Sequence, residues 1–267
     1  MAWAVFKDTM RYTWKMTLLW GIGFASMMIL TLQLSPALNG LQLVDLFASL
    51  PPWMMAAAGV TDVNVLASVE GLIAVGVFGK LALMFAAYPV VMGLRVTSAE
   101  EDNGTMDVML SLPLPRWRVI FEKFLAYTLN IIILMILTVS GLYIGQFGVN
   151  IDIDINKLIV VTLSVIPVMI FLLALTTFTG AVISRRQQVL TIITGYIIFS
   201  FVIQSLGPLV DSTWMNAIES FALFTYYNVE STLLNGVTMW HVALMLGLAL
   251  LLIGGSFINF ERRDIAV

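Results

Sequence analysis

The chain has 267 residues, of which 60% are hydrophobic and 11% are charged, and its mean hydropathy is +0.98. A soluble domain is about half apolar and about a quarter charged, so this composition excludes an ordinary cytosolic globule, a disordered chain and a coiled coil. The chain has no cysteine, which excludes disulfides, thiolate metal sites and cysteine nucleophiles. The net charge of −3 is too small to indicate a nucleic-acid partner.

Six long apolar runs predict an all-α membrane protein with six transmembrane helices. A spanning helix needs about 20 apolar residues, and these runs are too continuous for the alternating strands of a transmembrane barrel. The predicted spans are residues 16–34, 71–94, 124–147, 158–183, 189–206 and 239–258. With their loops they form one membrane domain over residues 16–267.

Lysine and arginine gather on one side of this predicted topology, and they place both termini in the cytoplasm. Of the 13 basic residues, 11 fall on that side, while Lys157 falls outside and Lys80 lies within a span. The 11 are Lys7, Arg11, Lys15, Arg95, Arg116, Arg118, Lys123, Arg185, Arg186, Arg262 and Arg263.

Residues 1–15 have the pattern of an amphipathic helix that lies in the headgroup plane. Its apolar face carries Trp3, Phe6, Met10 and Trp14, and its basic face carries Lys7, Arg11 and Lys15. The alternative is a simple N-terminal extension of the first span. A cleaved signal peptide is less consistent with the sequence, because the apolar run is too long and no small-x-small cleavage site follows it.

Lys80 is a candidate intramembrane ion in the second span. An ionisable group within a span is a functional candidate by default. However, Lys80 lies fifteen residues from Arg95 at the inner face, which is about 22 Å along a helix. We therefore expect its amine to reach outward to the headgroups or to pair with an outer acid such as Glu70.

The loop at residues 95–123 is the longest predicted cytoplasmic segment. Asp102 or Asn103 can cap a short helix that runs to about Leu112, before two prolines end it. The apolar face of this helix carries Met106, Met109 and Leu110. That face could fold back on its own bundle or enter a groove on a partner, where methionine adapts well. Amphipathicity alone leaves both alternatives open.

The third span contains Gly141 and Gly145 in a Gly-x-x-x-Gly arrangement, which permits close contact between helices. The outer segment at residues 207–238 is mostly apolar and aromatic, with acids spaced through it. This composition predicts short re-entrant helices that dip partway into the outer leaflet.

The sequence carries no recognisable catalytic or metal motif. His241 is the one histidine, and a lone histidine cannot build a site of histidine ligands. Residues 74–81 are not a phosphate-binding loop, because Ala74 and Leu81 stand where that loop requires glycine and a hydroxyl residue. We therefore expect no cofactor, no metal and no ATP site on this chain, and we do not expect it to be an enzyme.

Residues 100–113 read Glu-Glu-Asp-Asn-Gly-Thr-Met-Asp-Val-Met-Leu-Ser-Leu-Pro. This stretch resembles the acidic–Gly-Thr–x–x–x–Leu-Leu-Ser–x–Pro signature of ABC type-2 permeases, with Met109 where leucine is usual. Arg116 and Lys123 match the basic positions that follow the signature. Residues 224–227 and 233–236 resemble the family's outer segment, and residues 260–265 resemble its C-terminal end.

The resemblance implies a permease subunit of an ATP-driven exporter in the prokaryotic plasma membrane. Its partners would be a second permease subunit, as a homodimer or heterodimer, and a separate ATPase subunit that binds ATP and Mg²⁺. The short helix of residues 103–112 would be the coupling helix that docks on the ATPase. The ATPase-coupling residues implied are Glu100, Glu101, Gly104, Thr105, Met106, Met109 and Leu110.

Two other functions remain as alternatives. A secondary transporter driven by an ion gradient would need buried acids or interrupted helices in matching positions of two halves. A non-transporting sensor would need a soluble signalling domain. The sequence shows neither feature clearly.

Overall fold

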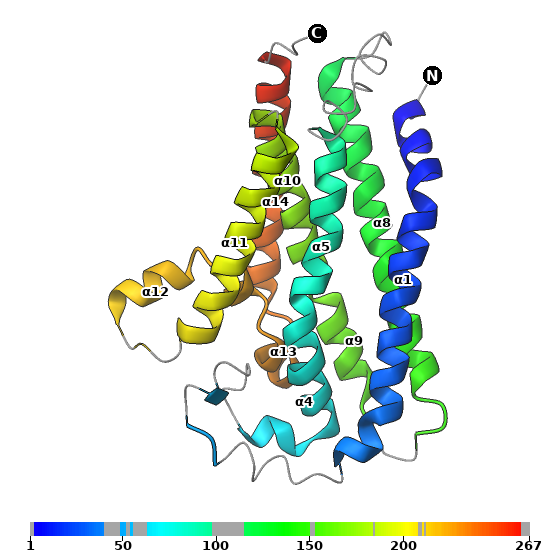
Figure 1. Cartoon of the computed structure of the whole chain (residues 1–267), viewed down its shortest axis with the longest axis vertical. Helices are drawn as coiled ribbons and strands as arrows, with labels where there is room; N and C mark the ends of the chain where they lie inside the picture. Colours follow the sequence, from blue (N-terminus) through cyan, green and yellow to red (C-terminus); the bar gives the residue numbers. More distant parts are fainter. Residues whose placement is uncertain are drawn as a thin grey trace.

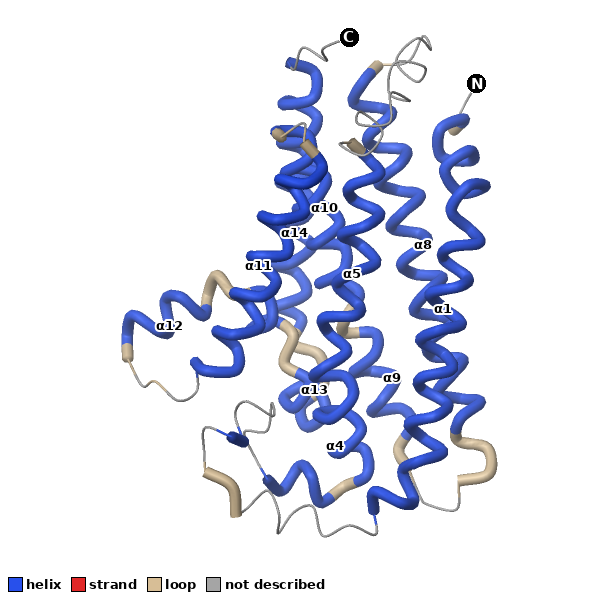
Figure 2. Tube along the Cα trace, viewed as in Figure 1, coloured by secondary structure: helices blue, strands red, loops and turns tan. Residues whose placement is uncertain are grey.

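The computed structural model of the chain describes residues 3–39, 49–51, 54–55, 63–97, 115–149, 153–183, 185–207, 210 and 212–262. Regular structure among these residues is helical, and the long helices run side by side along one axis (Figures 1 and 2). Five helices are long and apolar enough to cross a membrane, or six if one bent pair counts as a single span. The predicted all-helical membrane protein is confirmed at this level.

Each predicted span corresponds to an observed helix or helix pair. The unbroken ones are α1 (Ala4–Asn39), α8 (Arg116–Gly145), α11 (Arg186–Leu206) and α14 (Met239–Arg262). The second span consists of α4 (Val69–Ile73), the π-helix η2 (Ala74–Phe78) and α5 (Gly79–Val96), and the fourth consists of α9 (Ile155–Leu163) and α10 (Ile166–Val182). A short 3₁₀ helix, η1 (Val63–Ala67), precedes α4.

The separate interfacial helix expected at residues 1–15 is not observed. Instead, α1 runs without a break from Ala4 into the first span, so residues 4–15 extend that span (Figure 1). The reason is a buried stripe that the sequence pattern did not single out. Val5, Thr9 and Thr13 are all buried on the face toward α8, while Lys7 and Arg11 are exposed. An amphipathic helix therefore packs against a neighbouring helix along its whole length.

Two glycines of α8 bring α1 and α8 into close parallel contact. A Cβ atom added at Gly141 would lie 2.5 Å from the carbonyl oxygen of Ala25, and one at Gly145 would lie 3.0 Å from the Cα of Ile29. Real Cβ atoms do not approach so closely, so the Gly-x-x-x-Gly spacing does provide the helix contact that it predicted. The amide of Gln33 adds a hydrogen bond of 3.0 Å to the Gly145 carbonyl.

The outer segment forms short helices, as predicted. They are α12 (Thr213–Glu219), the 3₁₀ helix η4 (Leu223–Tyr226) and α13 (Val229–Asn235). In Figure 1, α12 projects sideways from the end of α11. The other two pack into the bundle: Phe224 is fully buried, and His241 at the start of α14 lies edge-to-face against Tyr226 with ring centroids 5.4 Å apart.

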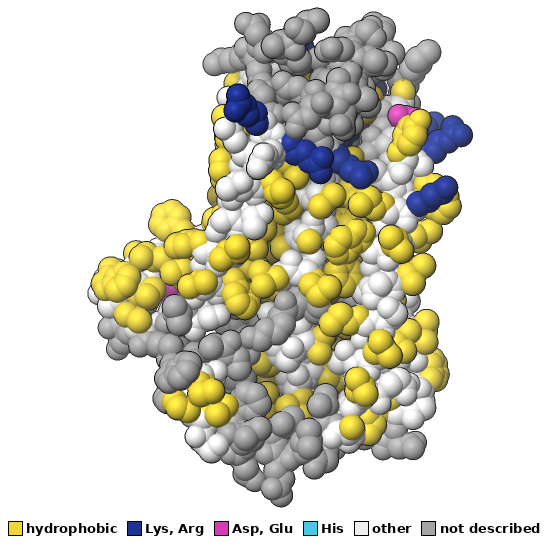
Figure 3. Space-filling model, viewed as in Figure 1, with side chains coloured by type: hydrophobic (Ala, Val, Ile, Leu, Met, Phe, Trp, Pro, Cys, Tyr) yellow, Lys and Arg dark blue, Asp and Glu magenta, His cyan; other side chains and the backbone are white. Residues whose placement is uncertain are grey.

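Both ends of the described chain lie at the same end of the bundle, which we call the basic end (Figure 1). The start of α1, the end of α5 and the starts of α8 and α11 meet there. Lysine and arginine side chains gather at this end in Figure 3. These helix ends carry Lys7, Arg11, Lys15, Arg95, Arg116, Arg118, Lys123, Arg185 and Arg186. Lys157, in α9, lies at the opposite end.

Candidate functional site

The predicted coupling residues lie outside the described residues. Glu100, Glu101, Gly104, Thr105, Met106, Met109 and Leu110 all fall within residues 98–114. The structure does describe both ends of that segment: α5 ends at Val96, and α8 begins at Arg116 after Pro115. Both ends lie at the basic end of the bundle (Figure 1). The candidate site is therefore the group of helix ends next to this segment: the end of α5, the start of α8 and the start of α1. We call this group the frame.

The third span begins earlier than the sequence pattern indicated. The predicted span starts at residue 124, whereas α8 starts at Arg116. Its first two turns are stable because Val119 and Ile120 are buried in the bundle while Arg118 stays partly exposed. The loop is thus joined directly to a rigid helix of 30 residues.

Glu122 is the central charged group of this frame. Its side chain is only 2% exposed, and Oε1 lies 2.7 Å from Nε of Arg118, one turn earlier on α8. Its other oxygen, Oε2, accepts a hydrogen bond of 3.1 Å from the backbone N–H of Phe6. A helix N-terminus has unpaired N–H groups and a partial positive charge, so a carboxylate is favourable there. Glu122 therefore ties the start of α1 to the start of α8.

Aromatic contacts near the start of α8 join this helix to α14 as well. Trp3 and Phe121 have ring centroids 6.4 Å apart, and Trp117 and Phe121 each lie edge-to-face against Phe257 of α14 at 6.3 and 6.4 Å. Such contacts contribute about 0.5–1.5 kcal/mol each beyond the area that they bury. They hold the starts of α1 and α8 against the end of α14.

A buried polar network connects the same helices nearer the middle of the bundle. Nδ2 of Asn130 in α8 donates a hydrogen bond of 2.8 Å to Oγ1 of Thr13 in α1. One turn on, Oγ1 of Thr17 lies 2.9 Å from the hydroxyl of Tyr88 in α5. Because the Thr17 hydroxyl donates to the Thr13 carbonyl at 3.1 Å, Tyr88 is the donor to Thr17. All four side chains are buried, so the network joins α8, α1 and α5 where water does not compete.

The structure describes the side chain of Glu70 but not that of Lys80, its expected partner. Lys80 is the second residue of α5, but its side chain lies outside the described set. Glu70 accepts a hydrogen bond of 2.7 Å from the backbone N–H of Asp154. The pairing of Lys80 with an outer acid stays a prediction.

The described polar residues form neither a metal-binding cluster nor a polar lining in the fourth span. No group of three or more histidine, cysteine or acidic residues that could hold a metal ion occurs in the part of the chain that the structure describes. The threonines of the fourth span bond to their own helix: the hydroxyls of Thr176, Thr177 and Thr179 donate to carbonyls four residues earlier. The contacts at the basic end thus join α8 to α1 and α14, and the Thr17–Tyr88 contact joins α1 to α5.

Comparison with known families assigns the chain to one of them. Residues 54–265 match the sequence profile of the ABC-2 family transporter proteins. The chain belongs to the ABC-2 transporter family. The match covers most of the chain and includes the loop, α8 and every later helix. No curated protein and no solved structure matches the chain.

Membership in this family makes the chain a membrane transporter permease, a transport component without an ATP site of its own.

The sequence alone did not indicate two residues of the frame. Glu122 is an acid among the basic residues that precede the apolar run, and Asn130 is the one asparagine within that run. Both were visible as polar exceptions, but only the fold shows what they contact.

Proposed function

We propose that this chain is the membrane-spanning subunit of an ATP-driven exporter that is powered by a separate ATPase subunit. Family membership supports the transporter role, and the observation that carries the coupling is the frame around residues 98–114. Both ends of this segment emerge at the basic end, beside the buried Glu122 tether. The segment also carries the residues that resemble a coupling helix.

The basic end is proposed to face the cytoplasm, where ATP is available. The lysines and arginines gathered at this end support that orientation, because basic loops are retained on the cytoplasmic side. The opposite end, with Lys157 and the short outer helices, would then face outward. We place the protein in the plasma membrane of a prokaryote.

In the proposed mechanism, closure of the ATPase displaces the coupling loop and the frame carries that motion into the spans. Displacement of the start of α8 moves α1, because Glu122 bonds to Phe6 and the glycines of α8 leave little room for sliding. It also reaches α5 through the Thr17–Tyr88 contact. The partner would bind ATP and Mg²⁺. This chain would form the transport pathway, which would open alternately to the two sides of the membrane.

A second permease subunit would complete that pathway. The support is the outer face of α11 and α12, where Ile198, Phe199 and Trp214 are 56%, 44% and 59% exposed. Thr194 and Gly195 are also exposed on α11. Small and hydroxyl residues on a membrane helix favour close contact with another helix over contact with lipid tails.

The test is purification of the tagged chain in mild detergent from its native membranes. We expect an ATP-binding-cassette subunit to copurify, and the preparation to hydrolyse ATP with Mg²⁺. Glu100→Gln with Glu101→Gln should keep that subunit bound while the turnover falls, because we place both acids at the joint between the loop and α5. A preparation without any ATPase subunit would contradict the proposal.

A further inference from the structure

The second and fourth spans are both interrupted at similar depths. The two spans lie in contact near the basic end, where a Cβ atom added at Gly93 of α5 would lie 2.6 Å from the Cβ of Thr176 of α10. Counted outward from this contact, α5 begins at Gly79 and α10 begins at Ile166, so the two breaks differ in depth by about one helical turn.

Each interruption has a local cause. In the second span, the π-helix η2 widens the backbone turn, and the helical segments of residues 69–78 and 82–96 are bent by 41° relative to each other. In the fourth span, Pro167 has no N–H to bond with the carbonyl of Leu163, so the helix breaks at residues 164 and 165. A Cβ atom added at Gly76 or Gly79 would meet nothing within 4 Å, so these two glycines adjoin open space, whereas Ala74 and Phe78 of η2 are fully buried. Breaks of this kind are where helices bend.

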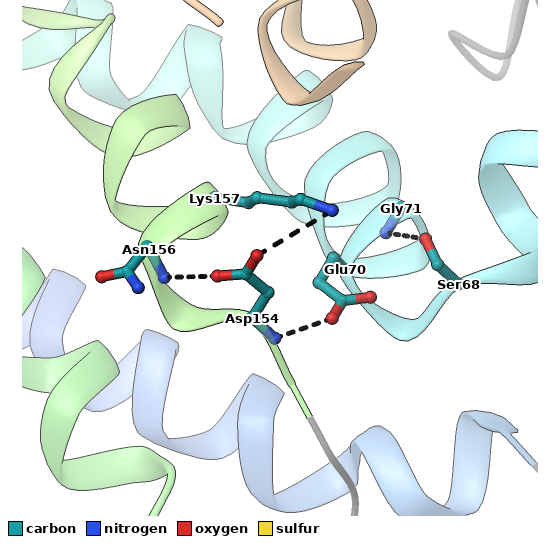
Figure 4. A network of polar contacts seen from close by, with 6 residues as sticks. All are labelled: Ser68, Glu70, Gly71, Asp154, Asn156 and Lys157. Carbon is teal, nitrogen blue, oxygen red and sulfur yellow. Dashed lines mark hydrogen bonds and ion pairs between the residues drawn. The ribbon is translucent and has the colours of Figure 1, made fainter. Parts of the chain in front are cut away.

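The outer halves beyond these breaks are joined by Glu70. Its Oε1 accepts a hydrogen bond of 2.7 Å from the backbone N–H of Asp154, the residue that caps α9 (Figure 4). Both helix starts are themselves fixed, since Oγ of Ser68 accepts from the Gly71 N–H at 3.1 Å and Oδ1 of Asp154 accepts from the Asn156 N–H at 3.1 Å. Lys157 lies 3.9 Å from Asp154, but both side chains are about half exposed, so this pair contributes little.

Hollows on both sides of Glu70 leave room for these halves to part. An open hollow of about 570 Å³ is lined by Glu70, Tyr143 and Asp154. A more enclosed one of about 150 Å³ is lined by Glu70, Ser68 and Lys157. The carboxylate thus bridges the starts of α4 and α9 beside two hollows.

We propose that Glu70 is a positioning residue that latches the outer halves of the second and fourth spans together. When its bond to Asp154 is released, the segment of α4 and η2 swings about the bend at residues 79–81 and parts from α9. The interpretation of this latch as a gate at the outer end of the transport pathway rests on the proposed function. Its existence does not depend on ATP or on a partner subunit.

The test is the labelling rate of buried cysteines by a polar maleimide in open membrane fragments, where both faces are accessible. The native chain has no cysteine, so each introduced thiol is read alone. Val161→Cys reports on α9, because Val161 is buried one turn deeper than Lys157 on the same face. Ile73→Cys reports on α4, and Leu173→Cys reports on the inner half.

In the Glu70→Ala background, labelling at residues 73 and 161 should rise about threefold or more, because the solvent-exposed hydrogen bond to the Asp154 N–H is lost. Labelling at residue 173 should not change. Glu70→Gln should behave like the native chain, because the amide oxygen still accepts the Asp154 N–H. An unchanged rate at residue 161 would overturn the proposal, as would a rise at residue 173 or equal effects of Ala and Gln. A rise confined to residue 73 would mean that α4 frays alone, which also overturns it.

Discussion

The backbone N–H of Phe6 donates a hydrogen bond of 3.1 Å to Oε2 of Glu122, 116 residues further along the chain. This bond places a buried carboxylate at the N-terminus of α1, while the other oxygen of the same carboxylate holds Arg118. It joins two spans at the basic end, close to the start of α8. In the proposed mechanism, displacement of α8 therefore also displaces α1.

Removal of this carboxylate should therefore destabilise the basic end. Glu122→Ala leaves the Phe6 N–H without an acceptor and Arg118 without its ion pair, at a cost of about 1–3 kcal/mol. Glu122→Gln keeps an acceptor and should cost less. The measurement is the thermal unfolding midpoint in detergent, with the exposed Asp8→Asn as the control that should change little. Equal midpoints for the Ala variant and the native chain would contradict the tether.

The close contact between α1 and α8 predicts that Gly141 cannot be replaced without loss of stability. Gly141→Ala would push a methyl group into the backbone of Ala25, and overpacking of this kind costs about 1–3 kcal/mol. Gly247 of α14 is the matched control, because a Cβ atom added there meets nothing within 4 Å. The Gly247→Ala variant should unfold at or above the native midpoint. A Gly141→Ala variant as stable as the Gly247→Ala variant would show that the two helices are not closely packed.

The hydroxyl contact between Thr17 and Tyr88 should show measurable coupling. Tyr88→Phe and Thr17→Val each remove one partner, and a double-mutant cycle isolates the pair. Hydrogen bonds between membrane helices average about 0.6 kcal/mol by such cycles. We expect a coupling of this size in unfolding free energy. Strictly additive effects would mean that α1 and α5 are not joined at this point.

The sequence patterns predicted the spans and one close contact between helices. Apolar runs longer than the membrane thickness predicted the spans, and the Gly141–Gly145 spacing predicted a close helix contact that α1 provides. The error at residues 1–15 has a physical origin. A helix in the headgroup plane and a helix packed against a neighbour both have one apolar face, so periodicity cannot separate them.

The candidate site was less predictable because its contacts are long-range. Nothing near Glu122 in the sequence indicates that Phe6 supplies its hydrogen-bond donor, and nothing near Asn130 indicates Thr13. The latch between Glu70 and Asp154 joins residues 84 positions apart. Such pairs form only once the helices have packed together. Local sequence patterns do not predict that packing.

The orientation proposed from the basic residues can be tested with single cysteines, because the native chain has none. A cysteine at Ser111 should be shielded from an impermeant thiol reagent in intact cells, and a cysteine at Asn150 should react. Detergent should make both residues reactive, which controls for local burial. The reverse pattern in intact cells would place the basic end outside.

The central claim is that the loop between α5 and α8 docks on a separate ATPase, and Met109→Asp tests it most directly. A charge on the apolar face of the coupling helix would be buried without a partner at the docking contact, which costs several kcal/mol. The spans do not depend on that face, so the permease should still insert and fold. Asp107→Asn, on the opposite face, is the matched control.

The decisive measurement is the amount of ATPase subunit that copurifies with each variant, together with its ATP hydrolysis. We predict that the Met109→Asp protein loses most of both while the Asp107→Asn protein retains them. A Met109→Asp protein that keeps its ATPase and its full hydrolysis rate would contradict the account, and the helix would then fold back on its own bundle.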